Sequence, residues 1–429
     1  MIDSIRDISA QGSSLATKLR DFCRQGHEPP SATTRQRFPT NETWQKLAST
    51  GTTLWLDTGD VDAISALWTQ EFDALTTNNT LLNKEIQKGI YDDLMPRVAD
   101  LLRDVEPDLS EELLVQEIAF ALNAVHGLTL VRTFDADVSV ELHTNLAYDT
   151  EASYEYGKRF WDICPDRFIV KVPLTPQGLI AARRLGQDGI RVNFTLGFSA
   201  RQNYLTAKVA RPSWVNVFMG RCNAFVSNSG LGDGANIGEK ATLASQRAVR
   251  EANANSGTNV RQIGASMRNG QQAVDLMGLD TYTIPTAVAE QYLEIDPAGE
   301  EMRDRTSDDP EVSLTRAEDL EGKRVDVFWR VDDEFRAAVD SLGHGVLDSM
   351  SGPELCSHLQ DQGCADVFPE LSQDDQDHLA TDGKIPLFER WAARVESGEL
   401  AWDSLLTKAG LASFTADQSA LDQRIRNQL

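Results

Sequence analysis

The stretch DRFIVKVPLT, residues 166–175, contains one lysine in an otherwise apolar run. Short runs of apolar and β-branched residues bounded by polar or turn-forming residues are typical of buried strands. Because side chains alternate across a strand, Lys171 shares a face with Ile169 and Pro173. The opposite face is wholly apolar and suits packing against helices; it comprises Val170, Val172 and Leu174. Lys171 is therefore predicted to point to the other side of the sheet.

Similar short runs recur along the chain. They are residues 52–58, 74–78, 138–142, 168–174, 191–196, 214–219, 260–266 and 281–285. Segments with helical spacing lie between most of them, including 151–164, 176–189 and 269–279. Eight strands alternating with helices within about 235 residues predict a (β/α)8 TIM barrel with additional N- and C-terminal helices. The alternative is a doubly wound open sheet, but no GxGxxG motif follows the first strand.

Three regions are expected. Residues 1–50 form an N-terminal helical and loop extension in which Thr40 or Asn41 caps a helix, and residues 51–295 form the barrel. Residues 296–429 form an acidic helical extension that packs on the barrel. Within it, residues 359–375 and 406–422 share a leucine, glycine and phenylalanine pattern, which we interpret as two short helical hairpins or as a coincidence.

Composition excludes several classes of protein. A net charge of -25 and a pI near 4.6 argue against nucleic acid as a partner. The first twenty residues lack a continuous apolar stretch, so we expect neither a signal peptide nor a membrane span, and a cytoplasmic location. The five cysteines are scattered and expected to be free thiols, and the six histidines are dispersed without zinc-site spacing. The glycine-rich run 230–242 lacks the GxxxxGK[ST] spacing and predicts a loop leading into a helix.

Lys171 lies near the carboxyl end of its strand, where enzymes of the TIM-barrel fold keep their active sites. Burying an unpaired ammonium costs several kcal/mol, so a buried lysine is paired with a carboxylate or kept as a neutral amine. A neutral buried amine is the nucleophile of Schiff-base chemistry. A lysine that reaches the rim of the barrel, or one with a purely structural ion pair, is the alternative.

Other strand ends carry polar side chains that suit chemistry on a carbonyl group. Proton transfer needs an acid or base, and a carboxylate with a hydroxyl can hold the water that relays protons. Taken singly, each group could be a cap or a polar core residue. Together, at corresponding strand ends, they predict a site composed of Asp57, Asn78, Glu141, Asn193 and Thr195.

Two arginines follow later strands, Arg221 in VFMGRC and Arg268 in GASMRN. Arginine recognises phosphate through paired hydrogen bonds, so two arginines at one rim predict a phosphate site. The alternative is a pair of surface ion pairs.

These residues and motifs resemble the transaldolase family. The resemblance rests on WLDTGD, ALTTNNTLL, VSVELHTNLAYDTEAS, DRFIVKVPLTPQGLIAARRL, GIRVNFTLGFS, VFMGR and IGASMRN, covers about residues 45–295, and extends to the C-terminal TKAGLASFTADQSALDQRI. It implies a (β/α)8 enzyme without metal or organic cofactor. Such enzymes move a dihydroxyacetone unit from fructose 6-phosphate or sedoheptulose 7-phosphate to an aldose phosphate, in the pentose phosphate pathway.

The resemblance also implies roles. Lys171 would form the Schiff base, Asp57 would be the acid and base in carbon–carbon cleavage, and Glu141 with Thr195 would bind water. The substrate would contact Asn78, Asn193, Asn216, Phe218, Arg221, Ser266 and Arg268, with both arginines on its phosphate.

Related aldolases that release free dihydroxyacetone carry a tyrosine in place of Phe218 and a glutamine in place of Glu141, so transfer is favoured here. Two residues depart from the family pattern. Asn79 replaces the usual proline, which predicts a looser loop after the second strand, and Asn216 replaces a serine that usually contacts the phosphate.

The leading hypothesis is a transaldolase acting on small sugar phosphates, with no membrane partner. Alternatives are a relative with another ketose or a sulfonated donor, an aldolase, and a catalytically silent sugar-phosphate-binding barrel. A metal-dependent enzyme using Glu141 and His143 lacks a third ligand. A monomer and a homodimer both remain open.

Overall fold

A computed structural model of the chain describes residues 10–26, 36–295, 301–315, 323–343 and 345–429. Parts of the predicted N-terminal extension, residues 1–9 and 27–35, lie outside the described residues. In the described part of that extension, α2 (Ser14–Arg24) and α3 (Glu42–Ala48) are helical. Asn41 is the N-cap of α3, and its side chain accepts hydrogen bonds from the backbone N–H groups of Thr43 and Trp44.

Eight parallel strands form a closed barrel in chain order, with β8 hydrogen-bonded to β1. The predicted TIM barrel is confirmed, and the open sheet is excluded. The strands are β1 (Thr53–Asp57), β2 (Phe72–Thr76), β3 (Asp137–Glu141), β4 (Phe168–Pro173), β5 (Val192–Thr195), β6 (Trp214–Phe218), β7 (Arg261–Ala265) and β8 (Thr281–Ile284).

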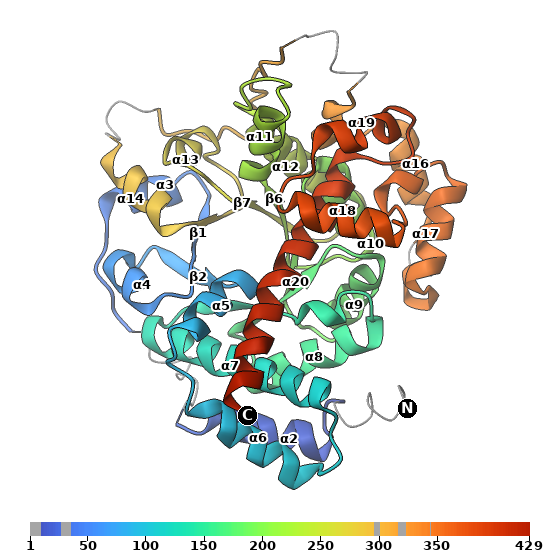
Figure 1. Cartoon of the computed structure of the whole chain (residues 1–429). Coiled ribbons are helices and arrows are strands. Elements are labelled where there is room, and N and C mark those ends of the chain that lie inside the picture. The colour runs from blue at the N-terminus through green and yellow to red at the C-terminus, as the bar shows by residue number, and fades with distance from the viewer. Residues whose placement is uncertain (1–9, 27–35, 296–300, 316–322, 344) are drawn as a thin grey trace.

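Helices surround the barrel (Figure 1). They are α4 (Val61–Leu67), α5 (Asn79–Gln87), α6 (Leu94–Val105), α7 (Glu111–Phe134), α8 (Thr150–Ile163), α9 (Pro176–Gln187), α10 (Ala200–Val209), α11 (Met219–Asn228), α12 (Ile237–Ser256), α13 (Gln271–Asp275) and α14 (Thr286–Glu294). The run 230–242 is a loop as far as Asn236 and then forms the start of α12, as the predicted lead-in to a helix requires.

The two faces of β4 behave as its alternation predicts. Val170 and Val172 belong to the apolar cluster between the sheet and the helices, whereas Ile169 belongs to the cluster inside the barrel. Lys171 therefore points inward. Lower in the barrel, the rings of Trp55 and Trp214 meet edge to face at 4.9 Å between centroids. The interior is thus a packed core, in which polar residues lie towards the carboxyl ends of the strands and also at positions such as Ser139 in the middle of β3.

Helix α7 is long and apolar enough, by length and composition, to cross a membrane, and no other helix in the described part of the chain is. Of its most apolar 18-residue window, 89% is buried inside the protein. Within it, Glu117 is fully buried and pairs with Arg159 of α8. The helix is therefore a core helix that packs against the barrel.

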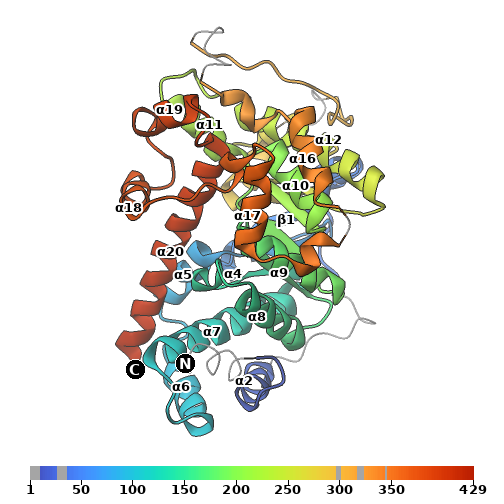
Figure 2. The same cartoon turned by 90° about the vertical axis from the view of Figure 1, so that its right-hand side faces the viewer.

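The C-terminal region is largely helical. It contains η2 (Val325–Phe328), α16 (Asp333–Ser341), η3 (Val346–Ser349), α17 (Gly352–Asp361), η4 (Ala365–Val367), α18 (Gln373–Asp382), α19 (Phe388–Glu396) and α20 (Trp402–Gln428). The predicted pair of hairpins is wrong, because residues 406–422 lie within the single 27-residue helix α20. Helix α20 crosses in front of the barrel in Figure 1 and lies along the lower part of one side of the molecule in Figure 2.

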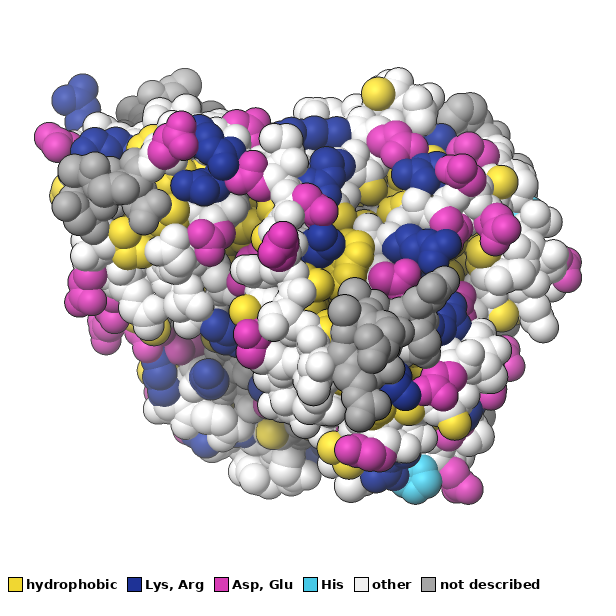
Figure 3. Space-filling model, turned by 90° about the horizontal axis from the view of Figure 1, so that it is seen from above, with side chains coloured by type: hydrophobic (Ala, Val, Ile, Leu, Met, Phe, Trp, Pro, Cys, Tyr) yellow, Lys and Arg dark blue, Asp and Glu magenta, His cyan; other side chains and the backbone are white. Residues whose placement is uncertain are grey.

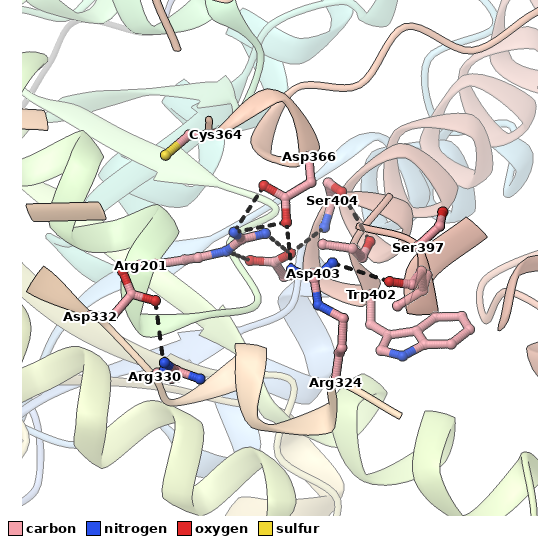
Figure 4. A network of polar contacts seen from close by, with 12 residues as sticks. Arg201, Arg324, Arg330, Asp332, Cys364, Asp366, Ser397, Trp402, Asp403 and Ser404 are labelled. Carbon is pink, nitrogen blue, oxygen red and sulfur yellow. Dashed lines mark hydrogen bonds and ion pairs between the residues drawn. The ribbon is translucent and has the colours of Figure 1, made fainter. Parts of the chain in front are cut away.

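A buried ionic network fastens this region to the barrel (Figure 4). Asp403 is 0% exposed and accepts hydrogen bonds from Arg201 Nε and Nη2, both at 2.8 Å. Arg201 also pairs with Asp366 of η4 at 3.1 Å. Ser199, the N-cap of α10, donates to Asp403 at 2.7 Å. The network therefore joins α10, which follows β5, to η4 and α20.

On the face drawn in Figure 3, Lys and Arg side chains alternate with Asp and Glu. The described part of the chain contains many ion pairs, for example Lys240 with Asp309 at 2.6 Å and Arg303 with Asp308 at 2.7 Å. Each of these four side chains is at least partly exposed, so each pair contributes little to stability.

Candidate active site

Lys171 is only 4% exposed and lies inside the barrel at the level of Asn193, its register partner on β5. Its Nζ donates a hydrogen bond to the carbonyl oxygen of Thr77 at 3.0 Å. The same atom lies 3.4 Å from Oε2 of Glu141, the register partner of Lys171 on β3. The predicted lysine and one predicted carboxylate are therefore neighbours inside the barrel.

Both predicted carboxylates are held in an apolar setting. Burial raises the pKa of Glu141, and the charge of Lys171 opposes this only in part. Burial likewise raises the pKa of Asp57 at the end of β1, against the opposing effects of Lys171 and of a hydrogen bond from Thr76. Thr76 Oγ1 lies 2.7 Å from Asp57 Oδ1. A carboxyl whose pKa is raised towards neutrality is suited to accept and return protons.

Two buried polar atoms near the lysine, Thr195 Oγ1 and Asn216 Oδ1, have no hydrogen-bond partner among the described residues. Glu141 Oε2 has the Lys171 ammonium at 3.4 Å. Asn193 Nδ2 donates to Ser139 at 3.1 Å, and Asn216 Nδ2 approaches Asn193 Oδ1 at 3.4 Å. Buried polar atoms are usually paired, so unpaired ones at a strand end indicate a place for a polar ligand or water.

Asn216 lies inside β6 and is 2% exposed. Its side-chain amide approaches Asn193 rather than an arginine. Asn78 is the N-cap of α5, and its Oδ1 accepts from the Leu81 N–H at 2.9 Å. This cap uses only the side-chain carbonyl oxygen of Asn78, so the side-chain NH2 group can still donate hydrogen bonds to a ligand.

The two predicted arginines are brought together by a glycine. Gly220, in the first turn of α11, donates its N–H to the Ser266 carbonyl oxygen at 3.2 Å. A Cβ atom at this position would lie 2.3 Å from that oxygen and 2.8 Å from the side chain of Arg268. Only glycine permits this approach, which places Arg221 beside the loop that follows β7. Ser266 itself has a φ of 63°, in the left-handed region.

Arg221 is almost fully buried, and its Nη1 has no partner among the described residues. Burial, together with the like charge of Arg268, lowers the pKa of Arg221 to about 10. Neither arginine has a carboxylate within 4.0 Å in the described part of the chain. The guanidinium of Arg221 lies between two aromatic rings, 5.3 Å from Phe218 and 5.7 Å from Phe414. This pair of arginines is suited to an anion.

Helix α20 forms one wall of the site, which the sequence did not predict in detail. Thr407 donates to the carbonyl oxygen of Leu196 at 2.9 Å and so holds the loop after β5. Gly410 faces Arg221, because a Cβ there would lie 3.1 Å from Nη1. Phe414, one turn further on, contributes its ring to Arg221. The resemblance to a closing helix pointed to this segment, but the periodicity did not reveal which side chains face the site.

Asn79 does not loosen the loop after β2, contrary to our prediction. It is the first residue of α5, where proline is favoured, and it is 2% exposed. Its Nδ2 donates to Gln418 of α20 at 2.8 Å, and the next residue, Thr80, bonds Asp417. Asn79 therefore lacks the fixed backbone angle of proline, but its side chain holds the start of α5 against α20.

His143 does not act with Glu141 as a pair of metal ligands. Its Nδ1 accepts from the Asn145 N–H, and its Nε2 lies 3.3 Å from Asp422 of α20. Within the described ranges, no group of three or more His, Cys, Asp or Glu side chains could hold a metal ion.

The carboxyl end of the barrel brings together a buried lysine, one buried and one half-buried carboxylate, and two arginines without a carboxylate within 4.0 Å among the described residues. This arrangement is suited to a carbonyl compound that carries an anionic group. The sequence profile described as Transaldolase/Fructose-6-phosphate aldolase matches residues 54–331, and the chain belongs to this family.

Curated relatives agree. The transaldolase of Xanthomonas oryzae pv. oryzae (strain KACC10331 / KXO85) is 32% identical over 241 residues, which is 55% of this chain and 73% of that protein. The transaldolase of Xanthomonas euvesicatoria pv. vesicatoria (strain 85-10) is 30% identical over the same shares. That of Shewanella piezotolerans is 29% identical over 247 residues, 56% of this chain and 75% of that protein. These relatives support the same assignment, a transaldolase-like aldolase.

Proposed function

We propose that this chain is a transaldolase that transfers a dihydroxyacetone unit from a ketose phosphate to an aldose phosphate through a Schiff base on Lys171. The observation that carries the proposal is the surroundings of the Lys171 amine. It is buried, lies 3.4 Å from Glu141, and stands among buried polar atoms that have no partner in the described residues.

In the first step the Lys171 amine adds to the C2 carbonyl of the ketose and gives a carbinolamine. Loss of the C2 oxygen as water then gives an iminium ion. Protonation of that leaving oxygen needs a nearby acid. Glu141 is suited to supply the proton, through a water held with Thr195, because burial favours its protonated form.

In the second step the C3–C4 bond breaks. A base removes the proton of the C4 hydroxyl, the C4 carbon leaves as an aldehyde, and the bonding electrons move through C3 and C2 to the iminium nitrogen. Asp57 is suited to this proton transfer. It is the last residue of β1, inside the barrel, and the nearby positive charge of Lys171 favours its ionised form. The three-carbon enamine remains on the lysine.

The enamine then attacks the aldehyde of the acceptor, and Asp57 returns the proton to the new hydroxyl. Water hydrolyses the resulting imine and frees the amine of Lys171. Arg221, whose Nη1 has no partner among the described residues, and Arg268 beside it are suited to bind the phosphate of donor and acceptor alike. Since α11 begins at Met219, its first turn adds backbone N–H groups to the same region.

Transfer competes with release of free dihydroxyacetone, which requires protonation of the enamine by water. Phe218 presents an apolar ring beside Arg221, and it also meets the Phe198 ring at 5.7 Å between centroids. This apolar pair offers no hydroxyl that could orient water towards the enamine. We therefore infer transfer rather than release.

A product assay tests the proposal. The full chain is incubated with fructose 6-phosphate, with and without erythrose 4-phosphate, and sedoheptulose 7-phosphate and free dihydroxyacetone are both quantified. Transaldolase activity predicts sedoheptulose 7-phosphate only when the acceptor is present. Free dihydroxyacetone without acceptor would indicate an aldolase, and no turnover would favour another ketose or a silent barrel.

A further inference from the structure

A groove of about 900 Å3 lies in the C-terminal region, outside the site described above. Its walls come from α17, the segment after η4, α18 and α20, which gather on one side of the molecule in Figures 1 and 2. Most of this lining lies beyond residue 331, where the match to the family ends. Neither Lys171 nor Arg221 lines the groove.

The walls of the groove are largely apolar. Its volume falls in the range of about 300–1,000 Å3 that is usual for small-molecule sites. The main apolar side chains are Pro176, Pro353, Phe368, Leu371, Leu379 and Leu411. An apolar groove of this size can bury the hydrocarbon part of a ligand.

One cation lies in this apolar setting. Lys408 of α20 lines the groove, and no carboxylate lies within 4.0 Å of its Nζ in the described part of the chain. The ammonium instead lies 5.7 Å from the centre of the Tyr148 ring. Burial lowers the pKa of Lys408, although the negative charge of Glu370 acts in the opposite direction. A half-buried ammonium without an ion-pair partner is costly unless a ligand supplies the anion.

The floor of the groove contains two further unpaired polar atoms. Thr144 Oγ1 and Gln177 Oε1 are buried without a hydrogen-bond partner among the described residues, and both residues line the groove. Thr144 is only 9% exposed. These atoms lie in the segments that follow β3 and β4. The Thr144 hydroxyl can donate a hydrogen bond to an anionic ligand, whereas Gln177 Oε1 can only accept one.

We propose that this groove is a second ligand site, which binds a small amphipathic monocarboxylate. The carboxylate pairs with Lys408, and the hydrocarbon part lies against the apolar walls. The single cation matches one negative charge. Glu370 and Asp377 also line the groove, so they repel any anion, and they repel a doubly charged phosphate ester more strongly than a monocarboxylate. This inference does not rest on the proposed transaldolase activity.

Octanoate is the probe, and 1-octanol is an uncharged ligand of equal chain length. Both are titrated into the full chain by isothermal calorimetry. Octanoate is expected to bind, and Lys408→Met should weaken its binding by about tenfold or more while leaving 1-octanol unaffected. Lys46→Met, at an exposed lysine of α3, is the matched control and should change neither affinity.

A third variant tests the location. Ala416 is an exposed residue of α20 that lines the groove, so Ala416→Trp should fill the groove without disturbing the core. It should remove binding of both ligands at an unchanged urea midpoint. The proposal is overturned if octanoate does not bind the wild-type chain, if Lys408→Met binds octanoate as well as the wild type, or if Ala416→Trp retains binding.

Discussion

Removal of the Asp403 carboxylate should destabilise the protein far more than removal of an exposed carboxylate. Asp403 accepts two hydrogen bonds from Arg201 and one each from Ser199 and the Ser404 N–H, all within 2.9 Å. Loss of one partner from a buried ion pair costs about 3–5 kcal/mol. Arg201 would keep Asp366, so we expect the lower end of that range, about 3 kcal/mol, for Asp403→Ala.

The assay is urea unfolding followed by tryptophan fluorescence. Asp348→Ala is the matched control, because Asp348 is 39% exposed and pairs with Arg183 at a similar distance, 3.1 Å. An exposed pair of this kind contributes less than about 1 kcal/mol. Asp403→Asn keeps an acceptor but removes the charge, and should fall between the two. Equal midpoints for Asp403→Ala and Asp348→Ala would refute the anchoring role of the network.

Three further predictions concern the site and its wall. Arg221→Met should raise the inhibition constant of inorganic phosphate by about tenfold, since an unpaired buried guanidinium is lost; an unchanged constant would exclude Arg221 from the anion site. Asp57→Asn should gain stability relative to the wild type as the pH rises from about 4, because burial raises the carboxyl pKa and its ionisation then penalises the folded wild type. Urea midpoints between pH 4 and 8 measure this difference, and a difference that shrinks with rising pH would contradict the pKa shift. Asn79→Ala and Gln418→Ala, each alone and combined, should show a coupling energy of about 1 kcal/mol in urea unfolding; strictly additive losses would mean that their hydrogen bond contributes nothing.

The strands could be predicted from sequence because a parallel barrel buries both faces of each strand. Runs such as 168–174 are therefore almost continuously apolar, and the lysine stands out against them. The second strand was placed two residues late. It begins at Phe72 rather than at residue 74, because Asp73 is exposed and resembles a loop residue. Thr77 and Asn78, assigned to its end, belong to the loop and the cap of α5.

The wall made by α20 could not be predicted, because a glycine in the sequence can indicate either a turn or close packing within a helix. Gly363 ends α17 with a φ of 77°, which is the turn that the hairpin interpretation required. Gly410 instead lies within the helix, where the missing side chain lets Leu196 and Arg221 approach. Sequence spacing does not distinguish a glycine needed for a turn from one needed for close packing. Likewise, the replacement of proline by Asn79 predicts a looser loop, because the sequence does not reveal the hydrogen bond from Asn79 to Gln418 far along the chain.

The most direct test of the central claim is reduction of the protein with borohydride in the presence of fructose 6-phosphate, followed by intact mass and peptide mapping. We predict a three-carbon adduct on the peptide that contains Lys171, its absence in Lys171→Met, and its retention in Lys46→Met. In Asp57→Asn, where cleavage should stall, a six-carbon adduct should accumulate at the same lysine. An adduct on another lysine, or none in a preparation that turns over fructose 6-phosphate, would contradict the account.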